Sequence, residues 1–188
     1  MKNEYSSAEL KRLSPEEVLA LFATLECPSI SEMHGEYAAT MLQQPSLFAS
    51  INAKVLVANP IMPWLCKAFR PVDESSGRGY NTFSLLGKVI QRFPMHTVIA
   101  PSRYDGKPAY QLVYRAFHSF CGQIHMVDEV RRVSPNLYLG IGTWGFSEKQ
   151  RLVALPFILQ PTQQDYRGDI GSERKGFSLR QQIPALKA

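Results

Sequence analysis

The chain has 188 residues, of which 45% are hydrophobic, 11% aromatic and 20% charged. This composition is close to the globular average, which excludes a disordered chain, a collagen-like fibre and a membrane bundle. The apolar runs, such as residues 54–58, are far shorter than the roughly 18 residues of a transmembrane helix, so we expect no membrane span. The first residues are polar and resemble no secretory or transit signal, which predicts a cytoplasmic protein.

The net charge of +5 raises the question of a nucleic-acid partner. The basic residues, however, are scattered among acidic ones, as in Asp128-Glu129-Val130-Arg131-Arg132. A nucleic-acid surface is typically a basic stripe interleaved with aromatic residues, and the chain contains none. We therefore expect no nucleic-acid partner.

The cysteines and histidines show no metal-binding pattern. The three cysteines are far apart and form no C-x-x-C pair, which predicts free thiols and no disulfide or zinc site. The histidines, likewise without metal-ligand spacing, are His34, His96, His118 and His125. Gly77-Arg78-Gly79 lacks the strand and helix of a dinucleotide fingerprint, so we expect no cofactor. If the protein is an enzyme, His34 or His125 is a candidate general base.

The amino-terminal region predicts one helix and then a strand. Ser14 is a cap, Pro15 stands at the first helical position, and Glu17 completes a capping box. Apolar residues then recur at helical spacing up to residue 25, which predicts an amphipathic helix over residues 15–25. Residues 35–42 are predicted to open the first strand.

Residues 45–71 are ambiguous, because their apolar residues fit helical spacing while Val55-Leu56-Val57 also suits a strand. Between Pro63 and Pro71 we expect one or two helical turns over residues 64–69. The polar run at residues 73–79 is predicted to be a surface loop.

From Tyr80 onward, short apolar runs and turn signals alternate about every ten residues, which is typical of a β meander. The predicted strands are residues 80–86, 88–92, 95–103, 108–117, 124–133, 137–146 and 151–159. Asp105-Gly106 favours a two-residue type I′ hairpin turn, which would pair Thr97 with Tyr114. The face that carries Thr97, Tyr110 and Tyr114 is predicted to point inward.

This pattern predicts a mainly β fold: an antiparallel meander closed into a lipocalin-like barrel, since closure removes exposed strand edges. We expect one domain, with a helical segment at residues 1–28, the barrel at 29–160 and a loose, polar extension at 161–188. Ile170, Phe177, Leu179 and Ile183 are the residues that would dock part of this extension.

Two short motifs add a family resemblance. His34-Gly35-Glu36-Tyr37 resembles the Gly-x-Trp signature that opens lipocalin-like barrels, with Tyr37 in place of the tryptophan. Tyr104-Asp105-Gly106-Lys107-Pro108 resembles a tyrosine-aspartate-x-x-proline turn of the bacterial GXWXG family. The resemblance implies a calycin-type barrel with an internal pocket for a hydrophobic or aromatic small molecule. Most such barrels bind and carry, and a minority catalyse isomerisation or cyclisation.

Residues 126–133 place an acid and a base on each face of a strand, since side chains alternate. Glu129 and Arg131 share one face, and Asp128 and Arg132 share the other. We predict that Glu129 and Arg131 point inward and hold the polar end of a ligand. A purely structural ion pair is the alternative. A three-residue loop after this strand sets Glu129 opposite Ile141, and a two-residue loop sets it opposite Gly140.

The sequence therefore favours the binding of a small hydrophobic or aromatic metabolite inside the barrel. The residues predicted to contact it are Tyr37, Thr97, Tyr110, Tyr114, Glu129 and Arg131. One alternative is a barrel enzyme that uses acid/base chemistry for isomerisation or cyclisation. Another is a structural or interaction protein whose barrel is filled by its own side chains. The ligand and the oligomeric state are not determined by the sequence.

Overall fold

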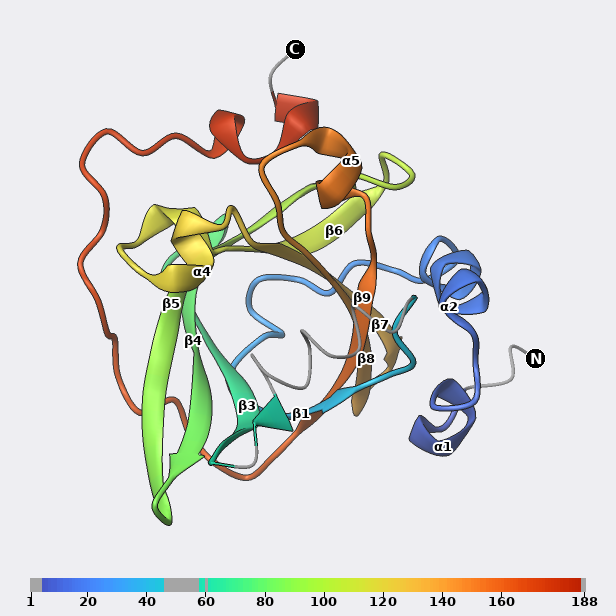
Figure 1. The fold of residues 1–188 in the computed structure, drawn as a ribbon, viewed down its shortest axis with the longest axis horizontal. Helices are drawn as coiled ribbons and strands as arrows, with labels where there is room; N and C mark the ends of the chain where they lie inside the picture. The colour runs from blue at the N-terminus through green and yellow to red at the C-terminus, as the bar shows by residue number, and fades with distance from the viewer. Residues whose placement is uncertain (1–4, 46–57, 60, 187–188) are drawn as a thin grey trace.

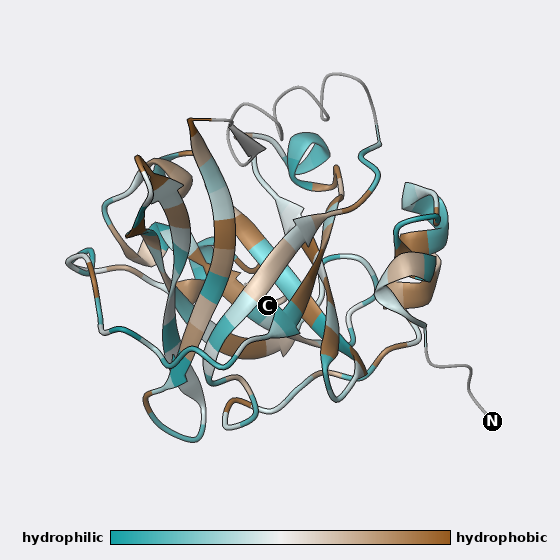
Figure 2. Ribbon diagram, turned by 90° about the horizontal axis from the view of Figure 1, so that it is seen from below, coloured by the Kyte–Doolittle hydropathy of each residue, from teal (hydrophilic) through white to brown (hydrophobic). Residues whose placement is uncertain are grey.

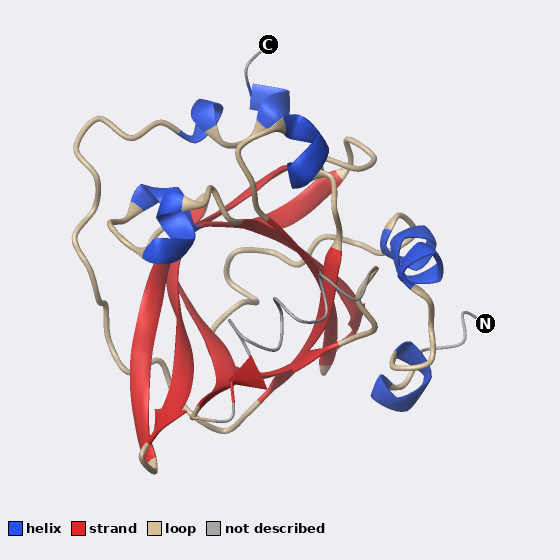
Figure 3. Ribbon diagram, viewed as in Figure 1, coloured by secondary structure: helices blue, strands red, loops and turns tan. Residues whose placement is uncertain are grey.

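The computed structural model describes residues 5–45, 58–59 and 61–186, which form a mainly β protein (Figures 1 and 3). The strands are β1 (Gly35–Met41), β2 (Ala58–Asn59), β3 (Met62–Pro71), β4 (Ser76–Leu85), β5 (Lys88–Pro101), β6 (Pro108–Val113), β7 (Val127–Ser134), β8 (Leu137–Thr143) and β9 (Leu155–Pro161). The helices are α1 (Ser7–Leu10), α2 (Pro15–Phe22), α4 (Phe120–Gln123) and α5 (Glu148–Arg151), with 3₁₀ turns η1 (Tyr114–Ala116), η2 (Leu179–Gln181) and η3 (Pro184–Leu186). No helix in these ranges is both long enough and apolar enough to cross a membrane.

Eight of the strands close into a barrel. The sheet order is β1-β9-β8-β7-β6-β5-β4-β3-β2, and an additional antiparallel pairing joins β1 to β3. Tyr37 of β1 is thus paired with Pro161 of β9 on one side and with Lys67 of β3 on the other. Figure 1 shows the strands as a ring with α1 and α2 outside it, and Figure 2 shows these two helices beside the barrel, near the amino terminus. The predicted closed antiparallel meander is confirmed.

The amino-terminal helix α2 forms as its capping box predicts. The main-chain N–H of Ser14 donates to Glu17 Oε2 (2.8 Å), and the main-chain N–H of Glu17 donates to Ser14 Oγ (3.2 Å). Val18 and Phe22 are fully buried against the outer surface of the barrel, in a cluster with Leu139. The helix ends at Phe22, three residues earlier than predicted.

The segment that follows α2 closes one end of the barrel. Ile30 and Met33 belong to the buried cluster inside the barrel. Glu32 accepts hydrogen bonds from Arg132 (3.0 Å) and from the hydroxyl of Tyr138 (2.9 Å), which fixes the segment to β7 and β8.

The predicted helical turns at residues 64–69 are wrong, because these residues lie in strand β3. Alternation along β3 buries Lys67 and Phe69, and pairing with β1 and β4 satisfies the main chain on both sides. The predicted loop at residues 73–79 is shorter, since β4 begins at Ser76. The ambiguous run at residues 45–57 lies, apart from Pro45, outside the described residues.

The hairpin between β5 and β6 differs from the prediction. Thr97 pairs with Leu112, so paired residue numbers sum to 209 and not 211, and residues 102–107 form a wider loop. Gly106 has a positive φ of 70°, but Asp105 does not, so this is no type I′ turn. The shift of two residues leaves every side chain on its predicted face, because strand side chains alternate with a period of two.

A two-residue turn with positive φ at both central residues occurs elsewhere, at Leu86 (49°) and Gly87 (77°). It joins Leu85 of β4 to Lys88 of β5. These two residues give the backbone twist that type I′ hairpins require.

The residues after β9 hold little regular structure and lie along the outside of the barrel (Figure 1). Arg167 pairs with Glu36 of β1 (2.7 Å), and Asp169 pairs with Arg70 of β3. Ile183 is buried in a cluster on the outer surface, with Phe177 partly buried against it. Docking by these apolar residues was expected, whereas the ion pairs were not.

Candidate functional site

A buried ion pair crosses the inside of the barrel. Lys67 Nζ lies 2.7 Å from Asp128 Oδ2, and both side chains are only 4% exposed. Lys67 is in β3 and Asp128 in β7, which are separated by three strands in either direction around the ring. The contact therefore spans the interior, and both side chains point inward.

Two further polar residues complete this network. The hydroxyl of Tyr114 donates to Asp128 Oδ2 (2.9 Å) and accepts from Lys67 Nζ (2.5 Å). Lys67 also donates to Asn81 Oδ1 (3.1 Å), and Asn81 Nδ2 donates to the Tyr114 hydroxyl (3.2 Å). We call these four residues the interior network. A buried charge persists when it is paired and hydrogen-bonded in this way.

The electrostatics of the interior network keep Tyr114 protonated. Burial, reinforced by the neighbouring Asp128 carboxylate, raises the pKa of the Tyr114 hydroxyl well above its ordinary value. A protonated phenol beside a carboxylate is a hydrogen-bond donor at every physiological pH.

Aromatic rings surround the interior network. Lys67 Nζ lies 5.1 Å from the ring centroids of Trp64 and Phe157 and 5.3 Å from that of Tyr114. Trp64 Nε1 also donates to Asn81 Oδ1 (3.1 Å). Gly140 makes room for Phe157, because a Cβ at position 140 would come within 2.2 Å of the ring. The network is thus a polar spot in an aromatic lining, which is how many small-molecule sites are built.

The interior network lies toward the end of the barrel opposite the segment that contains Ile30 and Met33. At this end, Met41, Trp64, Phe93 and Met126 pack against the interior cluster but are only partly buried. Phe93 has a positive φ of 53°, a strained conformation for a bulky residue, at a bulge between β4 and β5. At this end the lining therefore keeps some exposed surface.

One oxygen of the interior network is available. Asp128 Oδ2 accepts from Lys67 and Tyr114, whereas Asp128 Oδ1 accepts no hydrogen bond from any residue that the structure describes. Gly142 lies beside it, and a Cβ there would come 3.1 Å from Oδ1. A side chain at position 142 would crowd this oxygen, and the glycine avoids that contact.

The predicted tyrosines point inward. Tyr37, Tyr110 and Tyr114 all belong to the interior cluster, and the Tyr110 hydroxyl donates to Thr97 Oγ1 (2.9 Å). Tyr114 alone contacts the Lys67–Asp128 pair. Tyr37 lies near the closed end, where its hydroxyl donates to the Glu32 carbonyl (3.2 Å).

The prediction that Glu129 and Arg131 point inward is wrong. Arg131 points outward under α2 and forms two 2.7 Å hydrogen bonds with the Asp105 carboxylate. Glu129 accepts from the main-chain N–H of Arg103 (2.8 Å). Both charges are buried because α2 and the residue 102–107 loop cover this part of the outer surface. The inward acid of β7 is therefore Asp128.

The register around residues 133–137 combines the two predicted alternatives. Pro135-Asn136 is a two-residue turn, because Ser134 pairs with Leu137. A bulge between Arg132 and Ser134 then shifts the register, so Glu129 lies opposite Ile141, as the three-residue loop predicted.

Sequence reasoning missed Lys67 and Asn81. Lys67 was assigned to a helical turn, and Asn81 stood unremarked in a strand. If residues 64–69 had been predicted as a strand, alternation would have put Lys67 and Phe69 on one face and Trp64 on the other.

The candidate bases His34 and His125 lie elsewhere. His34 is exposed, and His125 is outside the barrel with Arg115 and Gln182. The described part of the chain also contains no group of three or more histidine, cysteine or acidic residues suited to a metal ion.

Comparison with known proteins supports the fold alone. No protein-family model matches the sequence, so none supports the GXWXG resemblance, and no curated protein matches it. A crystal structure of a protein from Thermomonospora curvata is similar, with a TM-score of 0.54 and 15% sequence identity. The similarity covers 83% of this chain and 93% of that chain. At this identity the two proteins share a barrel architecture, which agrees with a lipocalin-like fold at the level of a closed antiparallel barrel.

Proposed function

We propose that the protein binds a small, largely apolar or aromatic molecule inside the barrel, with its polar end at the interior network. The observation that carries this proposal is the Lys67–Asp128 pair, buried inside the barrel among Trp64, Phe157 and Tyr114. Apolar residues would fill the barrel at least as well, because replacing a buried ion pair with apolar residues often leaves a protein equally stable or more stable.

The hydrogen-bonding state of the interior network indicates what the ligand carries. All three protons of Lys67 are used, on Asn81, Tyr114 and Asp128. Asp128 Oδ1 remains as an acceptor. The ligand that fits is therefore one whose polar end donates a hydrogen bond, such as a hydroxyl, an amide N–H or an amine.

The test uses protein purified from its own host and examined by native mass spectrometry for a co-purified molecule. Lys67→Met combined with Asp128→Leu removes both charges together, so we expect it to fold and to lose the molecule. The matched control, Arg70→Gln with Asp169→Asn, removes an ion pair from the outer surface and should retain it. Retention of the molecule by the folded Lys67→Met/Asp128→Leu variant contradicts the proposal, and no co-purified molecule in the unaltered protein favours a filled barrel.

The free Asp128 Oδ1 favours an acid/base enzyme as the second candidate. A carboxylate oxygen without a partner can remove a proton from a ligand, and the nearby Lys67 side chain can stabilise the resulting anion through its charge. Incubating the bound molecule with the protein in deuterium oxide should then exchange a carbon-bound hydrogen for deuterium. Asp128→Asn should abolish this exchange, whereas a carrier produces none even with Asp128 present.

A further inference from the structure

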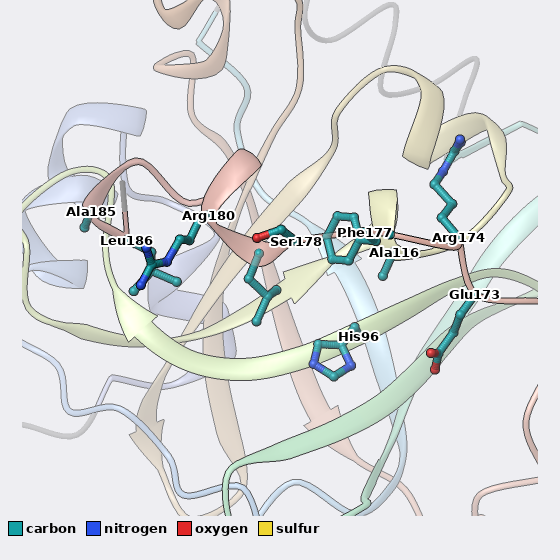
Figure 4. A pocket seen from close by; sticks show the side chains of 11 residues that line it. His96, Ala116, Glu173, Arg174, Phe177, Ser178, Arg180, Ala185 and Leu186 are labelled. Atoms are coloured by element: carbon teal, nitrogen blue, oxygen red, sulfur yellow. The ribbon is translucent and has the colours of Figure 1, made fainter. Parts of the chain in front are cut away.

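A cavity lies outside the barrel, beneath the carboxyl-terminal segment (Figure 4). It is a cleft of about 700 Å³ between the barrel wall and residues 173–186. His96 of β5 and Ala116 of η1 contribute from the barrel side. This volume is within the range of small-molecule sites, which is about 300–1,000 Å³.

One part of the cleft is apolar. Phe177, Leu179 and Leu186 line it and are only partly buried, although they pack on the outer cluster that contains Val98 and Ile183. Figure 4 places Phe177 above His96, between the two ends of the cleft. The faces that these side chains leave uncovered can therefore hold an apolar group.

The charged residues of the cleft are unbalanced. Arg174 and Arg180 line it, and neither forms an ion pair with any residue in the described ranges. The one acid of the lining, Glu173, lies 3.7 Å from Arg78. Burial lowers the pKa of His96, which favours its neutral form. The positive charge of the cleft accordingly comes from the two arginines.

The arginines lie at opposite ends. Arg174 is fixed by hydrogen bonds from its Nε to the Phe117 carbonyl (3.1 Å) and from its main-chain N–H to the Ala116 carbonyl (2.8 Å). Arg180 is exposed, and Figure 4 shows it beside Leu186. Its guanidinium group donates no hydrogen bond within the part of the chain that the structure describes. A guanidinium next to an apolar wall matches a carboxylate attached to an apolar body.

We propose that this cleft is a second binding site, for a carboxylate-bearing amphiphile whose carboxylate pairs with Arg180 and whose apolar part lies on Phe177 and Leu179. Arg174 strengthens binding from a distance through its positive charge. The site is separate from the barrel interior and does not depend on the interior network.

Isothermal titration calorimetry with dodecanoate tests the proposal. We expect dodecanoate to bind the full-length protein, and dodecanol, which lacks the charge, to bind at least tenfold more weakly. Binding of dodecanoate should also weaken as the salt concentration rises, because salt screens exposed charges. Equal affinity for the acid and the alcohol would overturn the assignment of the carboxylate to Arg180.

Variants locate the binding. Arg180→Gln should weaken dodecanoate binding about tenfold or more, and Arg174→Gln by a smaller factor. Arg92→Gln is the matched control, since Arg92 is exposed on β5 outside the cleft and should leave binding unchanged. Ala185 lines the cleft and is exposed, so Ala185→Trp should fill the cleft and abolish binding without disturbing the core.

The interior and the cleft are distinguished by the Lys67→Met/Asp128→Leu variant. It should keep its affinity for dodecanoate, because the cleft is independent of the interior network. If this variant loses dodecanoate while Ala185→Trp keeps it, the amphiphile binds in the barrel and the cleft proposal is wrong. If only Ala185→Trp loses dodecanoate binding, dodecanoate binds in the cleft, and this result does not depend on which molecule the barrel interior binds.

Discussion

Strand β7 carries two buried ion pairs, one on each side of the barrel wall, and they differ in what surrounds them. Arg131 points outward, and all five of its N–H groups donate: to the Asp105 carboxylate and to the carbonyls of Phe22, Lys107 and Pro108. Asp128 points inward, and one of its carboxylate oxygens has no donor among the residues that the structure describes. The saturated pair joins α2 to the barrel, and the unsaturated pair has capacity for a ligand.

The comparison shows that burial of a charge does not by itself identify a functional site. Arg131 is completely buried, and its guanidinium carbon lies 4.5 Å from the centroid of the Phe22 ring, which adds to its hold on α2. Such a residue is recognised as structural because its hydrogen-bonding capacity is used up by the fold. The distinction between these two ion pairs is that the fold satisfies every N–H group of Arg131, whereas Asp128 Oδ1 has no donor among the described residues.

The largest expected effect comes from breaking the inward pair. Lys67→Met leaves the Asp128 carboxylate buried without a counter-charge, which should cost about 3–5 kcal/mol of unfolding free energy. Adding Asp128→Leu should restore much of this loss. Denaturant unfolding of both variants measures the effect, and a stable Lys67→Met single variant would show that the two charges are not coupled.

The outward pair should be somewhat less sensitive. Arg131→Met leaves Asp105 unpaired, but the Asp105 side chain is 16% exposed and can regain water, so we expect a loss of about 2–3 kcal/mol. The variant should retain any molecule bound in the barrel. Native mass spectrometry of the variant checks this, and loss of the molecule with α2 still folded would remove the functional distinction between the two pairs.

A smaller change acts on the free oxygen directly. Gly142→Ala places a methyl group about 3.1 Å from Asp128 Oδ1, while Gly140→Ala drives one into the Phe157 ring at 2.2 Å. We expect Gly140→Ala to cost about 1–3 kcal/mol by overpacking, and Gly142→Ala to cost less but to weaken ligand binding more. The opposite order in binding would show that the ligand does not approach Oδ1.

The face of β7 that points inward could not be read from the sequence. Residues 126–133 give both faces an acid and a base at the same spacing, so local pattern treats Asp128 and Glu129 alike. The decision is made by Lys67, more than 60 residues earlier, in a strand whose prolines at both ends suggested a broken segment. The periodicity of a segment describes that segment alone, so it cannot identify a partner from a distant strand.

Other features were readable because their causes are local. The capping box that sets the start of α2 involves only the four consecutive residues from Ser14 to Glu17. The inward face of β5 and β6 was predicted correctly even though the turn was wrong, since a register shift of two residues preserves the faces. Closure of the ring through β1 and β3 was expected only from the general need to cover strand edges.

The smallest effect concerns Glu129, a carboxyl whose buried surroundings disfavour its charged form. Burial raises the pKa of this carboxyl, although the main-chain N–H of Arg103 opposes the shift, and Oε2 has no hydrogen-bond partner among the residues described. A raised pKa in the folded state contributes stability at pH values below the ordinary glutamate pKa of about 4.3, and this contribution is lost as the pH rises through the folded-state pKa. At neutral pH the ionised side chain therefore costs stability.

Glu129→Gln should accordingly raise the unfolding temperature at pH 7, with a difference that fades as the pH falls toward 4. The amide oxygen of the new side chain can still accept from Arg103. Glu9→Gln is the control of opposite sign, because hydrogen bonds from Ser6 lower the pKa of Glu9 and its ionised form stabilises α1. Thermal unfolding of both variants at pH 4 and pH 7 measures the two slopes. If Glu129→Gln is less stable than the unaltered protein at pH 7, the outward face of β7 needs a charge at position 129. Glu129 would then resemble Asp128, whose charge is stabilised by Lys67.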